Sequence, residues 1–261
     1  MDLGLTGKTA LVPGGGSGLG RAIACALARE GARVVVAGRT QAKLEATVAS
    51  ITAAGGKAWS LVWDLAEIDV MDERIRAVEN QFGSVDILIN NTGGPPPSPA
   101  SGQAPDLWRR QFEAMVLSVI AITDRVLPAM RARGWGRILT STSSGVVAPI
   151  PNLALSNALR LSLVGWSKTL AREVAADGIT VNVVVPGRIA TERVAFLDAA
   201  RAQRERRAAS DVTAESIAAI PLGRYGTPEE YGDVVAFLAS SRASYVTGSV
   251  IRVDGGLISS L

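Results

Sequence analysis

The sequence contains no histidine and only one cysteine in 261 residues. Without histidine the chain cannot build a Ser-His-Asp triad or a histidine metal site, and we expect no bound metal. With a single cysteine, Cys25, it cannot form an internal disulfide. Because Cys25 lies between Ala24 and Ala26 in a segment with helical periodicity, we interpret it as a small core residue and not as a nucleophile.

Aromatic residues and charge of one sign are also scarce: 5% of the residues are aromatic and the formal net charge is +3. Nucleic-acid binding typically needs a basic face with interleaved aromatics, so we expect no nucleic-acid partner. The one dense basic run, residues 201–207, is partly offset by Glu205 and is interpreted as a solvated helix face.

No apolar run approaches membrane-spanning length, and residues 1–8 lack a signal-peptide pattern. These features predict a cytoplasmic protein that binds no membrane.

Glycine is abundant at one informative place, between a predicted strand at residues 9–12 and a predicted helix at residues 19–29. The connecting loop contains Gly14, Gly18 and Gly20. Glycine has no Cβ, so a phosphate can approach this backbone closely, and the free N–H groups and dipole of the first helical turn favour an anion. The spacing is G-x-x-x-G-x-G, which differs from the G-x-G-x-x-G of the usual dinucleotide fingerprint. The loop predicts a nucleotide site.

Strands and helices are predicted to alternate through most of the chain. Further apolar strand runs occupy residues 33–37, 58–63, 85–89, 136–141 and 179–185, and helical periodicity covers residues 41–54, 68–82, 105–133 and 156–176. Apolar strands separated by helices indicate a parallel sheet that is covered on both faces. We predict one α/β domain over residues 1–261, a doubly wound Rossmann-type sheet of about seven strands. A small helical lid is expected at about residues 189–225.

The ends of these predicted strands share one edge of the sheet, where we expect a single ligand cleft. After the second strand the sequence reads Gly38-Arg39-Thr40, with no acidic residue before Glu45. Sites that prefer NAD place a carboxylate here, whereas arginine and a hydroxyl can face a 2′-phosphate. We therefore favour NADP, with NAD as the alternative. The alternative for Arg39 is that its side chain only stacks on the adenine or points into solvent.

Taken together, the motifs resemble the short-chain dehydrogenase/reductase superfamily, most closely its bacterial β-ketoacyl-(acyl-carrier-protein)-reductase-like branch. The resemblance extends over about residues 5–257. It depends on the glycine spacing, on Asp64 after the third strand, on Asn-Asn-Thr-Gly at residues 90–93, on Pro-Gly-Arg-Ile-Ala-Thr at residues 186–191, and on the closing segment at residues 248–256.

The resemblance implies where a dinucleotide would contact the chain. The implied residues are Gly14, Ser17, Gly18 and Leu19 for the pyrophosphate, Asp64 and Leu65 for the adenine, Asn91, Thr92 and Gly93 for a ribose, and Pro186, Gly187, Ile189 and Thr191 for the nicotinamide amide. It also implies a carbonyl or alcohol substrate in a pocket lined by residues 95–99, residues 146–153 and the lid. Finally, it implies a homotetramer or homodimer that pairs through the two long helices.

The family's catalytic residues are only partly present. Alignment places Ser156 at the tyrosine position, Arg160 at the lysine position, Ser143 at the serine position and Met115 at the asparagine position. A serine hydroxyl is a far weaker acid than a phenol, and arginine does not exchange protons as lysine does. Methionine cannot anchor a proton-relay water. Proton donation must therefore differ from the family's usual chemistry.

Two hypotheses of different classes follow. In the first, the chain is an NADP-dependent oxidoreductase in which Ser143 and Ser156 hold the carbonyl of a substrate such as a 3-oxoacyl thioester, and water or a lid residue supplies the proton. In the second, it binds a nucleotide without catalysis and acts in sensing or assembly. Ser156 and Arg160 would then be ordinary surface positions of a helix. Tyr225 lies next to the predicted lid and could reach the cleft from there, but we favour a packing role for it.

Overall fold

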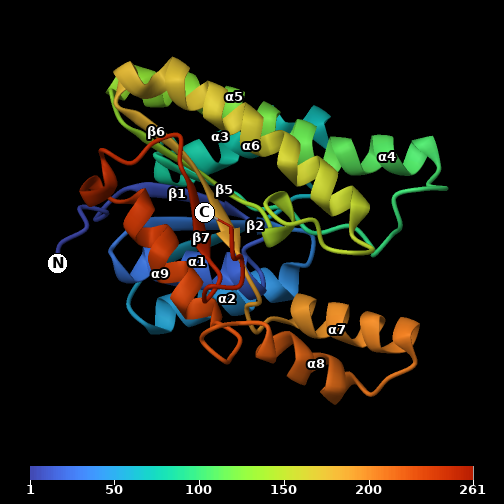
Figure 1. Cartoon of the computed structure of the whole chain (residues 1–261). Coiled ribbons are helices and arrows are strands. Elements are labelled where there is room, and N and C mark those ends of the chain that lie inside the picture. The colour runs from blue at the N-terminus through green and yellow to red at the C-terminus, as the bar shows by residue number, and fades with distance from the viewer. Residues whose placement is uncertain (261) are drawn as a thin grey trace.

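A computed structural model describes residues 1–260 of the chain. Its seven strands form one sheet in the order β3-β2-β1-β4-β5-β6-β7, and every neighbouring pair is parallel (Figure 1). The strands are β1 (Thr9–Pro13), β2 (Arg33–Gly38), β3 (Lys57–Val62), β4 (Ile87–Asn90), β5 (Gly136–Ser141), β6 (Ile179–Pro186) and β7 (Val250–Val253). The predicted doubly wound parallel sheet is confirmed. Its strand order reverses between β1 and β4, which is where such sheets bind ligands.

The helices lie in layers on both faces of the sheet (Figure 1). Helices α1 (Gly18–Arg29), α2 (Gln41–Ala53) and α9 (Pro228–Ala239) pack on one face, and α3 (Met71–Phe82), α5 (Ser118–Arg133) and α6 (Ala154–Val174) pack on the other. Helix α4 (Pro105–Phe112) and the pair α7 (Glu192–Glu205) and α8 (Ala209–Ala218) project beyond the sheet on the same side. The pair coincides with the predicted lid.

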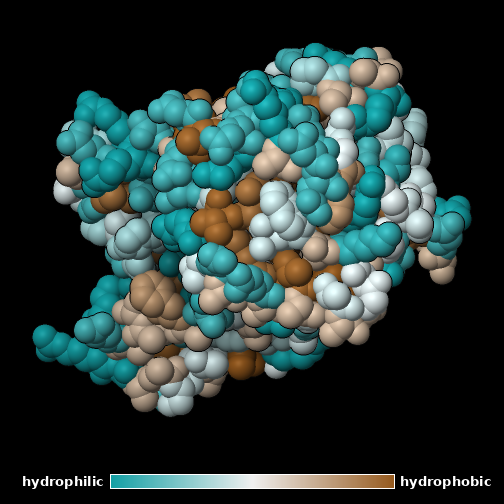
Figure 2. All heavy atoms as spheres, turned by 180° about the vertical axis from the view of Figure 1, so that it is seen from behind, coloured by the Kyte–Doolittle hydropathy of each residue, from teal (hydrophilic) through white to brown (hydrophobic). Residues whose placement is uncertain are grey.

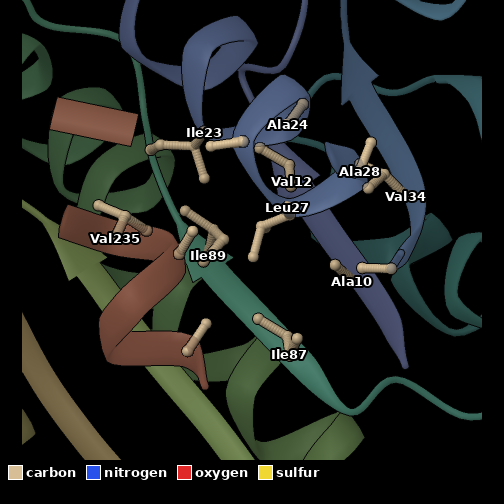
Figure 3. Close-up of a cluster of buried hydrophobic side chains, with 14 of the residues drawn as sticks. Ala10, Val12, Ile23, Ala24, Leu27, Ala28, Val34, Ile87, Ile89 and Val235 are labelled. Carbon is tan, nitrogen blue, oxygen red and sulfur yellow. The ribbon is translucent and has the colours of Figure 1, made fainter. Parts of the chain in front are cut away.

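The two apolar layers follow from the alternation of side chains along each strand. In β1, Ala10 and Val12 join the cluster that contains Ile23 and Leu27 of α1, whereas Leu11 joins the cluster on the opposite face. All five side chains are fully buried. Figure 3 shows the first cluster, in which side chains of α1 and of Val235 on α9 meet side chains of β1, β2 and β4. This packing holds the loop between β1 and α1 at the sheet's edge.

The predicted long helix at residues 105–133 contains a π-helical segment, η2 (Glu113–Leu117), between α4 and α5. The wider turn carries Met115 and Val116 into a small apolar cluster. Leu159 and Leu163 of α6 complete that cluster, and both are buried within the chain. These two leucines therefore serve the core rather than an interface. The exposed leucine of α6 is Leu161, with 51% of its surface accessible.

Among residues 1–260, no helix combines the length and apolarity needed to cross a bilayer.

Short 3₁₀ turns complete the structure: η1 (Ile68–Val70) before α3, η3 (Ser144–Val146) after β5, η4 (Ala175–Asp177) after α6 and η5 (Ser241–Ala243) after α9. The turn η3 follows β5 at the carboxyl edge of the sheet.

Candidate functional site

A cavity of about 810 Å³ opens at the carboxyl ends of the strands. Seen from behind, the surface is notched between two projecting lobes, which correspond to α4 and to the α7–α8 pair (Figure 2). The cavity is lined by every residue proposed from the sequence for cofactor or catalysis: Gly14, Ser17, Gly18, Leu19, Arg39, Asp64, Leu65, Asn91, Thr92, Gly93, Ser143, Ser156, Arg160, Pro186, Gly187, Ile189 and Thr191. The structure thus brings together residues from six strand ends.

Gly14 and Gly20, at the junction of β1 and α1, have no room for a side chain. Gly14 has a φ of +64°, and a Cβ on it would lie 2.5 Å from the side-chain nitrogen of Asn91. A Cβ on Gly20 would lie 2.1 Å from the carbonyl oxygen of Gly14. Asn91 in turn donates a hydrogen bond from Nδ2 to the carbonyl of Pro13 at 3.0 Å. These contacts join the ends of β1 and β4 and leave a backbone-lined floor.

The first turn of α1 is free to accept an anion. It has no acidic residue, and the side chain of its N-cap, Ser17, makes no capping hydrogen bond. Backbone N–H groups at a helix start remain unsatisfied unless a side chain, water or ligand accepts them. Pro13, the last residue of β1, has no N–H group, and Gly15 donates a hydrogen bond to the carbonyl of Ala37 on β2 at 3.2 Å. This cradle fits the pyrophosphate of a dinucleotide.

The corner after β2 carries cationic side chains at the cavity wall. Arg39 and Thr40 are exposed there, and Lys43 lies one turn further along α2. Lys43 also forms an ion pair with Glu192 on α7 at 3.2 Å. We did not identify Lys43 from the sequence, although its spacing of four residues from Arg39 places it near the same corner. This corner suits a 2′-phosphate.

Arg160 is buried and does not lie on the helix surface. Its guanidinium donates three hydrogen bonds to backbone carbonyls, to Ser141 at 3.1 Å, Thr92 at 3.1 Å and Gly93 at 3.2 Å. Burial lowers the pKa of Arg160 to about 10, so it remains protonated at neutral pH. The cation therefore ties the end of β5 to the loop after β4 and adds positive charge to the cavity wall.

Two serine hydroxyls face the same cavity. Ser143 caps η3, and its Oγ accepts a hydrogen bond from the N–H of Gly145 at 3.2 Å, which leaves the hydroxyl proton available. Ser156, one helical turn before Arg160, is also buried, with 6% of its surface accessible. Its Oγ makes no hydrogen bond within residues 1–260. The interpretation of Ser156 and Arg160 as surface positions is wrong, because α6 presents both to the cavity.

No tyrosine reaches this cavity within the described chain. Tyr231 is fully buried, its hydroxyl lies 2.8 Å from Ser141 Oγ, and burial raises its pKa. Tyr225 donates to Asp198 at 2.6 Å within the lid, and Tyr245 is fully exposed. Met115, at the asparagine position, does line the cavity. The cavity therefore holds hydroxyls and cations but no phenol.

The lid is fastened to the cavity by polar contacts. Thr191 caps α7 by accepting from the N–H of Val194 at 3.3 Å. Arg188 pairs with the buried Asp198 at 2.6 Å. Arg193 donates to the carbonyl of Pro95 at 2.6 Å and lines the cavity, although sequence analysis did not identify it. The only signal in the sequence was its place two residues after Thr191.

Comparisons with known proteins agree with this geometry. A profile of the family described as Enoyl-(Acyl carrier protein) reductase matches residues 14–258. The 3-oxoacyl-(acyl-carrier-protein) reductase of Escherichia coli is 39% identical over 254 residues, which cover 96% of this chain and 97% of that protein. The corresponding reductase of Synechocystis is 34% identical over 257 residues, covering 97% and 98%.

Solved structures show the same architecture. The L-sorbose reductase of Gluconobacter frateurii, in complex with NADPH and L-sorbose, superposes with a TM-score of 0.93 at 32% identity, covering all of both chains. A variant of the actinorhodin polyketide ketoreductase with NADPH gives a TM-score of 0.92 at 33% identity, covering 96% and 97%. The chain therefore belongs to the short-chain dehydrogenase/reductase superfamily of oxidoreductases, in the branch of the 3-oxoacyl-(acyl-carrier-protein) reductases.

Proposed function

We propose that this chain is an NADP-dependent oxidoreductase that reduces the carbonyl group of a small substrate, such as a 3-oxoacyl compound, to a hydroxyl. The observation that carries the proposal is the convergence of the glycine cradle, the Arg39 corner and the hydroxyls of Ser143 and Ser156 on one cavity. NADPH is bound by two structural relatives that match nearly the whole chain. Their names and those of the curated relatives describe carbonyl reduction.

The cradle of the loop between β1 and α1 would hold the pyrophosphate, and Arg39 with Thr40 would face the 2′-phosphate. The cofactor, when bound, supplies the hydride. Ser143 and Ser156 each have a hydroxyl proton free to point at a carbonyl oxygen, so together they can hold and polarise it. The fixed charge of Arg160 stabilises negative charge that develops on that oxygen.

Proton delivery is the step for which the chain provides no evident acid. Ser156 can donate a hydrogen bond, but its hydroxyl is too weak an acid to give up the proton by itself near neutral pH. Arg160 keeps its proton because all three of its hydrogen bonds are made to carbonyls. We propose that water entering the open cavity supplies the proton to the alkoxide that the two serines hold.

A second candidate function is nucleotide binding without turnover. The observation that favours it is the same set of substitutions, because Arg160 is occupied by the main chain and Met115 offers no polar group to a relay water. Such a protein would still need the cradle and the Arg39 corner. It would have no need of Ser143.

Ser143 therefore provides the test. With NADPH and a panel of carbonyl compounds that includes 3-oxoacyl thioesters, we expect oxidation of NADPH above the blank. We expect Ser143→Ala to lower kcat by about 100-fold, as loss of a donor to a developing oxyanion does. Ser162→Ala, an exposed serine of α6 away from the cavity, is the matched control and should leave kcat unchanged. Tight NADPH binding without turnover on any compound would instead establish the second function.

Arg39 sets the expected preference for NADP. Removing its charge in Arg39→Gln should weaken NADPH binding by about 10-fold or more, because a charge-assisted contact to the 2′-phosphate is lost. Binding of NADH, which lacks that phosphate, should not change. Fluorescence titration of both cofactors measures the difference. Arg21→Gln on the exposed side of α1 is the control, and equal loss for NADPH and NADH in Arg39→Gln would refute the assignment.

We also propose that the chain acts as a homodimer or homotetramer in the cytoplasm. Leu117 at the end of η2 and Leu161 on α6 have 39% and 51% of their surfaces exposed, and Trp166 on α6 is partly buried. Exposed apolar side chains on adjacent helices are typical of a surface that another protein covers.

A further inference from the structure

Arg193 forms part of the cavity wall where the lid meets the loop after β4. It is the second residue of α7, and its Nη2 donates to the carbonyl of Pro95 at 2.6 Å. A Cβ on Gly94 would lie 2.9 Å from Nη2, so the guanidinium packs directly against that glycine. Its other face lies over the ring of Phe196, 5.5 Å from the centroid. The side chain is thereby held in place rather than extended into solvent.

Arg193 has no acidic partner within residues 1–260, in contrast to two other arginines of the lid region. Arg188 is paired with Asp198, and Arg201 is paired with Glu205 and Glu215. Within the described part of the chain, Arg193 makes a single hydrogen bond, the one to Pro95, so the remaining N–H groups of its guanidinium are available. A partly buried cation without a counter-charge is costly, and an incoming anion would relieve that cost.

Arg193 lies on the side of the cavity where the loop after β4 approaches the start of α6. The loop that it contacts continues to Ser98, whose N–H donates to the carbonyl of Asn152 at 2.8 Å and whose carbonyl accepts from Ala154 at 3.1 Å. Ala154 begins α6, two residues before Ser156. The charges of Arg193 and Arg160 also repel one another across the cavity, which contributes to the lowered pKa of Arg160. Two guanidiniums without an acidic partner in residues 1–260 thus line the same cavity as the serine hydroxyls.

We propose that the substrate of this chain carries a carboxylate, and that Arg193 is the residue that selects it. This inference depends on the proposed reduction and narrows its substrate class from 3-oxoacyl compounds in general to carbonyl compounds with a free acid group. The planar guanidinium can bind a carboxylate with two parallel hydrogen bonds, which a neutral ester or amide cannot match. Arg193 then orients the carbonyl toward Ser143 and Ser156.

The test compares a carboxylate with its neutral amide on the NADP⁺-saturated protein. Calorimetric titration with 3-hydroxybutyrate and with 3-hydroxybutyramide should show that the wild type binds the carboxylate at least 10-fold more tightly. In Arg193→Met this ratio should fall to about one, while the affinities for the amide and for NADP⁺ stay within 2-fold. Arg193→Lys should keep part of the preference. Arg207→Met, a lid arginine outside the cavity lining, is the matched control.

Three results would overturn the inference. The first is an unchanged carboxylate-to-amide ratio in Arg193→Met. The second is a loss of NADP⁺ affinity in that variant that accounts for the weaker carboxylate binding, because Arg193 would then hold the cofactor. The third is tighter binding of inorganic phosphate than of the carboxylate at this site. Failure of NADP⁺ to bind the wild type would refute the proposed function instead, and the same ratio measured without NADP⁺ would still test Arg193.

Discussion

Replacing Ser156 with tyrosine and Arg160 with lysine in one chain is expected to raise kcat for carbonyl reduction by about 100-fold or more. A phenol at position 156 would put a true general acid where only an aliphatic hydroxyl now faces the cavity. A lysine at position 160 would keep the cation one helical turn away and lower the pKa of that phenol. Ser156 lines the cavity of about 810 Å³, into which the ring would extend.

The control for this gain is the pair Ser156→Phe with Arg160→Lys, which introduces the same ring without its hydroxyl. Steady-state oxidation of NADPH with one fixed carbonyl substrate measures all three proteins. Equal rates for the tyrosine and phenylalanine pairs would show that proton donation is not the missing element. Turnover by the tyrosine pair in a background where the wild type has none would show that the chain retains a productive cofactor and substrate geometry.

The second large effect is expected at Gly20. Gly20→Ala should weaken NADPH binding by more than 100-fold and lower the free energy of unfolding by about 3 kcal/mol. The reason is steric: the new Cβ would lie 2.1 Å from the carbonyl oxygen of Gly14, a backbone atom that cannot move without opening the loop. That opening would also break the contact between the loop and Asn91, whose Nδ2 would lie 2.9 Å from the same Cβ.

A matched glycine in another helix separates this effect from helix propensity. Gly165 lies in α6, is exposed, and would place its Cβ in open space. Gly165→Ala should therefore stabilise the chain by about 0.8 kcal/mol and leave NADPH binding unchanged. Urea denaturation and fluorescence titration measure both variants. Unimpaired cofactor binding by Gly20→Ala would show that the cradle does not hold the dinucleotide.

The catalytic interpretation changed most between sequence and structure at Arg160. From the sequence, Arg160 was expected either at the position of the family's catalytic lysine or on the surface of a helix. The structure shows a buried guanidinium bonded to the carbonyls of Ser141, Thr92 and Gly93. Its partners are far away in sequence, so their identity depends on how β4, β5 and α6 meet. Periodicity along a helix carries no information of that kind.

The sequence by itself determined the fold class and the glycine loop, because apolar strands that alternate with helices and glycine at a crowded turn are local patterns that report directly on backbone geometry. The other residues expected around the cavity came from the resemblance to the family. Only the tertiary structure decided that Met115 turns inward through the π-helical segment η2, that Leu159 and Leu163 belong to the core, and that Arg193 closes the cavity wall. These depend on which surfaces distant segments present to one another, and that is settled by packing in three dimensions.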